Sequence, residues 1–247
     1  MNNNISVIIQ GPLDETSLSN YPNYKKYGDV FISIWQNENI KKTFEKYNID
    51  INQNVIIKDM PILPSHHGIN QTSKFFYVLK SMYNILDSIK TDYIIRTRSD
   101  EKYENLDILI EKFFKNTDKL VFGNIFVRKY SDLPNHIGDH IYMVKTNIYK
   151  EMISLLINMY EKNEKYESWA DQNKIPCECI LANCFLKIKN INQDKWLDKN
   201  TIKDNFDLFD INKTQNFIAK WQNNNKTYIN KFENQHGHFD CIEHYLS

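Results

Sequence analysis

Short apolar runs alternate with helical patterns through the first half of the chain. The compact runs cover residues 5–9, 29–35, 54–57, 93–97 and 121–127. Runs of this length, bounded by turn residues, are typical of buried strands. The first run leads into Gln10, Gly11 and Pro12, and the fifth is interrupted by Gly123. The pattern therefore predicts five strands, the first of which stops in a turn.

Four further stretches carry apolar residues at the spacing of an amphipathic helix. The strongest of them places six residues on one face: Phe75, Val78, Leu79, Met82, Leu86 and Ile89. The others begin after Asn105, after Thr146 and near Pro176, a residue type that is favoured in the first helical turn. Because near-continuously apolar strands alternate with helices, we predict an α/β fold with a mostly parallel central sheet and helices on both faces.

The charge balance limits the partners of such a domain. Lys plus Arg and Asp plus Glu both number 31, so the formal net charge of the 247-residue chain is zero. Nucleic-acid and anionic-membrane binders usually carry a basic excess, and we expect neither partner. No apolar run approaches the roughly 20 residues of a membrane span, and the first residues lack the pattern of a signal peptide. We therefore expect a cytoplasmic protein without a transmembrane segment.

Polar residues follow three of the predicted strands. Gln10, Gly11 and Pro12 follow the first strand, Trp35 ends the second, and the run RTRSDE at 96–101 follows the fourth. In open parallel sheets, ligands bind beyond the carboxyl ends of the strands. We therefore expect these three segments to converge at one edge of the sheet and to form a binding site there.

The run after the fourth strand combines cations with carboxylates. The chain has only three arginines, and two of them, Arg96 and Arg98, lie here. The guanidinium of Arg98 offers a planar fork for phosphate oxygens. Asp100 and Glu101 offer the oxygen ligands that Mg²⁺ and Mn²⁺ prefer. The run thus predicts a site for a diphosphate and a metal ion, and the alternative is a surface ion-pair cluster at a strand end.

Four short motifs, taken in their order along the chain, resemble the WavE lipopolysaccharide-synthesis family. They are ISVIIQGPL at 5–13, FISIW at 31–35, GINQTSKFFYVL at 68–79 and IIRTRSD at 94–100. Proteins of that family are regarded as glycosyltransferases of the GT-A type. The resemblance covers roughly residues 5–190 and implies a Rossmann-like fold that transfers a sugar from a nucleotide-sugar donor.

The resemblance also implies that residues 1–247 form a single domain with two functional halves. Residues 1–130 would form a nucleotide-binding half, and residues 131–247 an acceptor and catalytic half with a C-terminal extension. Besides Arg98, the residues implied to border the nucleotide are Gln10, Gly11, Pro12, Ser33, Trp35, Asn70, Gln71 and Lys74.

The predicted metal site departs from the wider glycosyltransferase pattern. Enzymes of this type usually carry Asp-x-Asp after the fourth strand, whereas the matching triplet here is Arg98-Ser99-Asp100. We expect Mn²⁺ or Mg²⁺ to be held by Asp100 and Glu101, with the late His238 or His236 completing the ligand set. The alternatives are an exposed C-terminal segment without a ligand, and an Arg98 that neutralises the diphosphate itself.

Two later carboxylates compete for the role of general base. Asp139 lies between Gly138 and His140, just before an apolar run, and Glu178 lies near the first turn of the helix that follows Pro176. An inverting transferase needs one carboxylate to take the proton of the acceptor hydroxyl. For Glu178 there is a simpler reading, because an acidic residue in a first helical turn complements the helix dipole.

We therefore predict a glycosyltransferase that uses a nucleotide-sugar donor. Its acceptor would be a glycan or a lipid-linked molecule in the synthesis of a surface polysaccharide or glycoconjugate. One rival is a sugar-phosphate nucleotidyltransferase, which usually has a glycine-rich basic loop after the first strand that QGPLDET at 10–16 lacks. The other rival is a non-catalytic protein that binds nucleotide-sugars, and turnover separates it from an enzyme.

Overall fold

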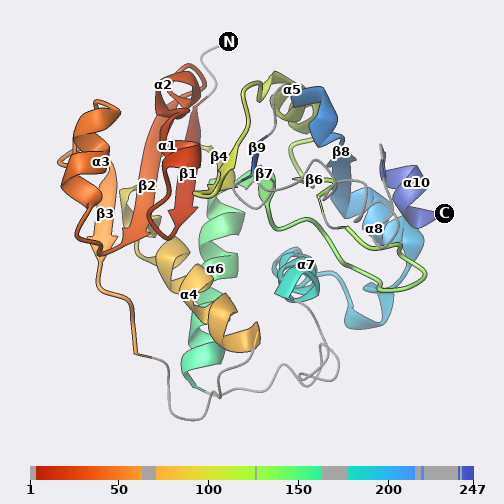
Figure 1. Ribbon diagram of the computed structural model, residues 1–247. Coiled ribbons are helices and arrows are strands. Elements are labelled where there is room, and N and C mark those ends of the chain that lie inside the picture. Colours follow the sequence, from red (N-terminus) through yellow and green to blue (C-terminus); the bar gives the residue numbers. More distant parts are fainter. Residues whose placement is uncertain are drawn as a thin grey trace.

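A computed structural model describes residues 4–62, 71–125, 127–162, 177–214, 218–219, 239 and 241–247. Its centre is a seven-stranded sheet with the strand order β3-β2-β1-β4-β7-β6-β8 (Figure 1). The strands are β1 (Ile5–Gly11), β2 (Asp29–Trp35), β3 (Val55–Lys58), β4 (Tyr93–Arg98), β6 (Leu120–Gly123), β7 (Ile141–Lys145) and β8 (Phe206–Phe209). A second, two-stranded sheet pairs β5 (Glu101–Lys102) with β9 (Ile218–Ala219).

The central sheet is mostly parallel. The strands β3, β2, β1 and β4 run in one direction, and β6 is parallel to β8. The exception is β7, which pairs antiparallel with β4 on one side and with β6 on the other. Because β7 runs against its neighbours, the segment that precedes it ends at the same edge as the carboxyl end of β4.

Helices cover both faces of the sheet. One face carries α4 (Gln71–Tyr83), α6 (Thr146–Glu161) and α7 (Cys177–Ile188), with α8 (Lys199–Asn205) and α10 (Ile242–Leu246) near β8. The other face carries α1 (Glu15–Leu18), α2 (Tyr21–Tyr24), α3 (Ile40–Lys46) and α5 (Asp107–Lys115). The predicted α/β fold class, with a mostly parallel sheet covered on both faces, is confirmed (Figure 1).

The alternation of β1 explains why both faces are apolar. Val7 and Ile9 pack into the cluster under α1 and α3, while Ile8 packs into the cluster under α4 and α6. All three side chains are fully buried. A strand with side chains buried on both faces needs an apolar run without polar alternation, which is the pattern of residues 5–9.

The predicted elements differ from the observed ones in two places. The helix predicted to carry Leu86 and Ile89 ends at Tyr83, and Leu86 begins a separate 3-10 turn. The other differences lie in the C-terminal half of the sheet. The fifth apolar run forms a strand only as far as Gly123, and the chain then leaves the sheet. The apolar run at 141–145 is the unpredicted strand β7, and β8 lies in the Asn-rich last third, where no strand was expected.

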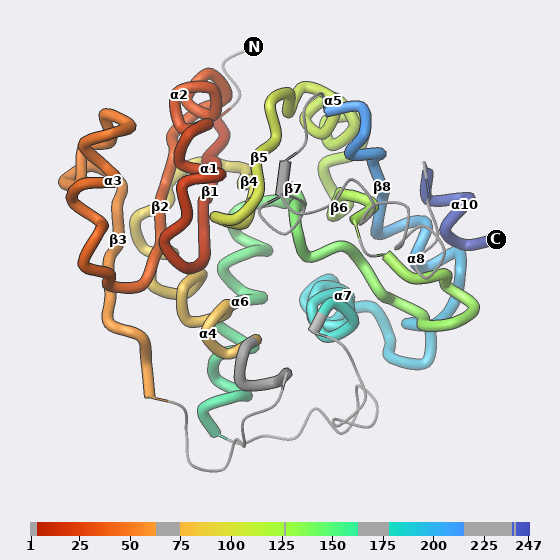
Figure 2. The backbone as a smooth tube through the Cα atoms, viewed as in Figure 1, coloured from red at the N-terminus to blue at the C-terminus, as the bar shows by residue number. Residues whose placement is uncertain are grey.

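The segment between β6 and β7 returns to the sheet through a tight contact. Figure 2 follows it from β6 past α7 and back to β7. Within it, the side chain of Asn135 donates to Asn183 of α7 at 2.7 Å. Gly138 lies directly against the end of β6, where a Cβ atom on it would meet the carbonyl oxygen of Gly123 at 2.2 Å. Only glycine allows this approach of two backbones, and it sets the position of the residue that follows, Asp139.

Candidate functional site

Arg96 is enclosed at the end of β4, beside β1. The two strands are parallel neighbours, so their carboxyl ends lie together. Oε1 of Gln10 accepts hydrogen bonds from Nε and Nη2 of Arg96 at 3.0 and 2.7 Å. Nη1 of Arg96 donates to the carbonyl oxygen of His140 at 3.4 Å, and the guanidinium lies 5.8 Å from the centre of the Tyr142 ring. All of these contacts are to neutral groups.

Arg98 is paired with a carboxylate of its own segment. Its Nε and Nη2 donate to the two carboxylate oxygens of Asp100, both at 2.8 Å. Nε also lies 3.6 Å from Oε1 of Glu101. Burial by itself would raise the pKa of Asp100, but the bonds from Arg98 outweigh it and lower that pKa. The fork predicted to bind phosphate is thus occupied by Asp100.

Glu101 is fully buried in β5 and holds two side chains. Its Oε2 accepts a hydrogen bond from the hydroxyl of Tyr103 at 2.7 Å, and its Oε1 pairs with Nδ1 of His140. Burial by itself would lower the pKa of His140, but the carboxylate of Glu101 outweighs it, so the pKa of His140 is raised. Glu101 therefore favours the charged imidazolium and fixes the plane of its ring.

Asp139 lies at the same edge, next to the other side of the His140 ring. Its Oδ1 is 3.7 Å from Nε2 of His140. Burial by itself would raise the pKa of Asp139, but His140, Arg96 and Arg98 together outweigh it and lower that pKa. This carboxylate is held in its ionised form by cations from β4 and from its own loop.

Glu178 occupies the first turn of α7, as the sequence predicts. Its Oε2 lies 3.9 Å from Nε2 of His136. His136 is also close enough to Asp139 to contribute to its lowered pKa. The two carboxylates that the sequence offers as candidate bases are therefore both near His136, although they come from different elements.

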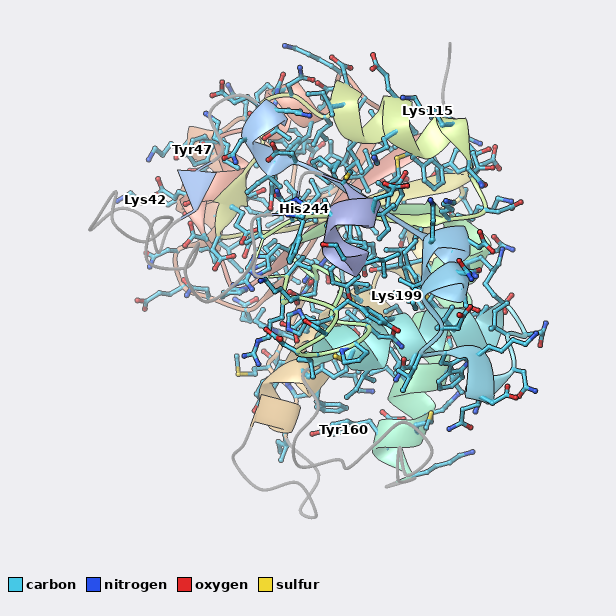
Figure 3. All side chains as sticks on the ribbon, turned by 90° about the vertical axis from the view of Figure 1, so that its right-hand side faces the viewer. Lys42, Tyr47, Lys115, Tyr160, Lys199 and His244 are labelled. Atoms are coloured by element: carbon cyan, nitrogen blue, oxygen red, sulfur yellow. The ribbon has the colours of Figure 1, made fainter. Side chains whose placement is uncertain are left out.

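A cleft with a volume of about 740 Å³ lies beyond the carboxyl ends of β1 and β2. Its lining combines residues that follow β1, residues that follow β2 and one face of α3: Leu13, Asp14, Glu15, Thr16, Asn37, Asn39, Lys42, Thr43 and Lys46. Lys46 and Tyr47 hold the carboxylate of Glu15. Lys42, labelled with Tyr47 in Figure 3, lines the cleft and has no ion-pair partner among the residues that the structure describes.

The cleft and the charged residues are joined through Ser99. Its backbone N–H donates to the carbonyl oxygen of Gln10, and its carbonyl oxygen accepts from the N–H of Ser17 in α1, both at 3.0 Å. Gly11 permits this closeness, because it has a φ of 140° and a Cβ on it would lie 2.6 Å from Oγ of Ser99. One wall of the cleft is thus tied to the residue between Arg98 and Asp100.

The residues predicted to border a nucleotide lie in different surroundings. Gln10 holds Arg96, and Pro12 is exposed at the turn. The hydroxyl of Ser33 donates to the carbonyl oxygen of Ser81 in α4 at 2.6 Å, so it ties β2 to a helix. Trp35 packs edge-on against Tyr77 of α4, with ring centres 6.5 Å apart, and is not part of the cleft lining.

Several predicted residues are only partly described. Gln71 and Lys74 belong to the first turn of α4, of which the structure describes the backbone alone. Asn70, His236 and His238 lie outside the described residues. Among the described residues, no three His, Cys, Asp or Glu side chains gather to hold a metal ion. Asp100 is engaged by Arg98 and Glu101 by His140 and Tyr103, so neither presents an open ligand set.

Sequence reasoning missed the roles of His136, His140 and Lys42. His140 directly follows Asp139 and precedes an apolar run. This pattern could have predicted that His140 lies at the start of a strand, next to a carboxylate. Lys42 offered no signal, because one exposed lysine on a short helix of a lysine-rich chain is unremarkable.

The site and the sheet define the class of protein: an α/β domain with a polar cleft and a buried charged cluster at the carboxyl edge of a mostly parallel sheet. No family model matches the chain, and no curated protein matches it. The resemblance to the WavE family therefore stays a prediction. Among the described residues, no helix has both the length and the apolar character needed to cross a membrane.

Solved structures resemble parts of the chain. One is glucosyl-3-phosphoglycerate synthase from Mycobacterium tuberculosis with Mn²⁺, uridine diphosphate and phosphoglyceric acid, at 14% identity and a TM-score of 0.40, covering 64% of each chain. The same enzyme with Mg²⁺ and uridine diphosphate gives a TM-score of 0.38 at 14% identity, over 64% of this chain and 65% of that one. The chain thus spans less than two thirds of the length of these structures.

A third similar structure is HddC from Yersinia pseudotuberculosis. It has 12% identity and a TM-score of 0.37, and the match covers 59% of this chain and 78% of that one. The synthase structures hold a divalent cation together with a nucleotide.

The raised pKa of His140 predicts how stability depends on pH. The pKa of a histidine in an unfolded chain is about 6.5, and the folded value is higher because Glu101 pairs with the ring. The stabilisation is therefore fully present below about pH 6.5 and is lost as the pH rises through the folded pKa. Urea unfolding at a series of pH values should show that the free energy of unfolding declines as the pH rises. In His140→Asn this decline with pH should be smaller.

The matched control is His244→Asn, because His244 is exposed in α10. That variant should keep the decline of the wild-type protein. A decline of the same size in His140→Asn would show that another group causes the pH dependence.

Proposed function

We propose that this protein is a glycosyltransferase that moves a sugar from a nucleotide-sugar donor to a hydroxyl group of a glycan or lipid-linked acceptor. The observation that carries the proposal is the joining of two features at one edge of the sheet. A polar cleft of about 740 Å³ lies beyond β1 and β2, and a buried set of charged side chains lies at the end of β4. Ser99 links them through backbone hydrogen bonds on both sides.

The cleft suits the nucleoside part of the donor. Its volume falls within the roughly 300–1,000 Å³ of small-molecule sites. Its amides and hydroxyls, from Asn37, Asn39, Thr16 and Thr43, match the hydrogen-bonding groups of a base and a ribose. Lys42 supplies a cation whose charge is not balanced by an ion pair with any described residue, and such a charge favours a phosphate-bearing ligand.

Arg98 is the proposed partner of the diphosphate. Nε and Nη2 of Arg98 donate to the carboxylate of Asp100. A bound diphosphate would replace Asp100 as the acceptor of these two hydrogen bonds. A divalent cation remains a predicted cofactor. The described residues do not bring together three side chains that could hold it.

Glu178 is the proposed general base, and Asp139 a fixed anion that accepts a hydrogen bond from a substrate hydroxyl. Asp139 is surrounded by cations that lower its pKa, and a carboxylate stabilised in this way is a weak proton acceptor. Glu178 has a side chain that is 20% exposed and a histidine neighbour, His136, at 3.9 Å. It would take the proton of the acceptor hydroxyl as the oxygen attacks the anomeric carbon and the nucleoside diphosphate leaves.

The rival nucleotidyltransferase reading finds less support in the site. β1 ends at Gly11, and the residues between β1 and α1, Pro12, Leu13 and Asp14, include no further glycine and no Lys or Arg. A loop that wraps a triphosphate needs several backbone N–H groups and a cation at this place. The cations that line the polar cleft, Lys42 and Lys46, instead come from α3.

Binding of a nucleotide in the cleft is tested by a matched pair of lysine variants. Lys42→Ala should weaken the binding of a nucleoside diphosphate roughly 10-fold to 100-fold, because about one charge-assisted hydrogen bond is lost. Lys41→Ala, at an exposed neighbour that does not line the cleft, should bind like the wild-type protein. Titration calorimetry over uridine, guanosine, cytidine and thymidine diphosphates measures both, and equal affinity in the two variants would place the nucleotide elsewhere.

The role of the base is tested by turnover. Glu178→Gln should lower kcat by about 100-fold or more, while donor affinity stays unchanged, because the proton acceptor is lost and the shape is kept. The control is Glu151→Gln, which makes the same change from carboxylate to carboxamide at an exposed position of α6. This variant should be fully active. Normal turnover by Glu178→Gln would transfer the role to another group, with Asp139→Asn as the next variant to measure.

A further inference from the structure

The guanidinium of Arg96 is buried without a carboxylate partner. Arg96 is 1% exposed and is among the largest fully buried side chains. Its contacts are the amide oxygen of Gln10, the carbonyl oxygen of His140 and the ring of Tyr142. Among the residues that the structure describes, no carboxylate forms an ion pair with it. Buried charges are usually paired, so this arrangement needs a reason.

Gln10 occupies the place in which a carboxylate would be expected. Its Oε1 receives two N–H bonds from one edge of Arg96, at 3.0 and 2.7 Å, and Gln10 is itself 3% exposed. A carboxylate in the same place would make the same two bonds and would also neutralise the guanidinium. An amide orients the guanidinium equally well but, being neutral, does not neutralise its positive charge.

The anion that feels this charge is Asp139. Arg96 donates to the carbonyl oxygen of His140, the residue that follows Asp139, and it is one of the groups that lower the pKa of Asp139. The charged or titratable groups that act on Asp139 or are acted on by it come from β4, from its own loop and from β7: Arg96, Arg98, His136, His140 and Tyr142. Two of the cations are already compensated, because Arg98 pairs with Asp100 and His140 pairs with Glu101. Arg96 is the cation without such a partner among the described residues.

We propose that Gln10 is a positioning residue that fixes a buried, uncompensated cation behind Asp139. By accepting both bonds from Arg96 without cancelling its charge, Gln10 keeps Asp139 as an anion at the carboxyl edge. Only one part of this inference rests on the proposed function, namely that the Asp139 carboxylate accepts a hydrogen bond from a substrate hydroxyl. The electrostatic arrangement itself is a property of the free protein and can be measured without a substrate.

The test is the titration of the Asp139 carboxyl, followed by carbon-13 NMR in the full chain and assigned with Asp139→Asn. In the wild-type protein, Asp139 should still be ionised at about pH 4, near the ordinary pKa of aspartate. Gln10→Glu keeps the shape of the side chain and adds a charge that neutralises Arg96, so the midpoint of Asp139 should rise by about one pH unit. Gln36→Glu makes the same change at an exposed glutamine beyond β2 and should leave the midpoint unchanged.

A second variant separates the charge of Arg96 from the new carboxylate. Arg96→Met removes the cation and keeps much of the length, and the midpoint of Asp139 should rise in it as well. An unchanged midpoint in folded Gln10→Glu would overturn the proposal, as would a wild-type Asp139 that titrates in the ordinary range or above it. The wild-type titration decides the matter if either variant fails to fold. Failure of the proposed function is a separate result, because it would show as lost donor binding with the titration intact.

Discussion

Positive charge buried at the end of β4 is the constraint on which the rest of this structure depends. Two arginines lie in one strand end: Arg96 is fully buried, and the side chain of Arg98 is 33% exposed. Buried charges are usually paired or hydrogen-bonded. Asp100 and Glu101 follow in the same segment, whereas Asp139 comes from the loop before β7.

The direction of β7 brings this loop to the same edge of the sheet. Because β7 is antiparallel to β4, its amino end, with Asp139 and His140 just before it, arrives at the carboxyl end of β4. Gly138 lets this segment press against the backbone of Gly123, and His140 then connects Asp139 to Glu101. The resulting row of carboxylates and cations lies at one edge of the sheet, and Ser99 joins it to the wall of the cleft. The position of this charged cluster is thus a consequence of the direction of β7.

The sequence was sufficient to predict the parts of the fold that local patterns encode. Strands β1 and β2 are buried on both faces, so their apolar runs carry the signal directly, and the carboxyl-edge rule predicted that the segments after β1 and β4 meet, as Gln10 and Ser99 do. What the sequence could not show was partner choice. Nothing in residues 96–101 says that Arg98 closes on Asp100 while Arg96 turns to Gln10, because that depends on the register of β1 against β4. The family resemblance implied that Ser33 and Trp35 border the nucleotide, but strand alternation turns both toward α4.

Hydrogen–deuterium exchange of the full chain, with and without nucleotide-sugars, shows directly whether such a donor binds at the carboxyl edge of β1, β2 and β4. Binding there should slow exchange in the segments after these strands, around residues 13–16, 37–43 and 99–101, and in the loop before β7. The opposite edge has a smaller cavity, lined in part by Thr117, Lys145 and Asn147. Protection confined to that edge, with the carboxyl edge unchanged, would show that the proposed donor site is wrong.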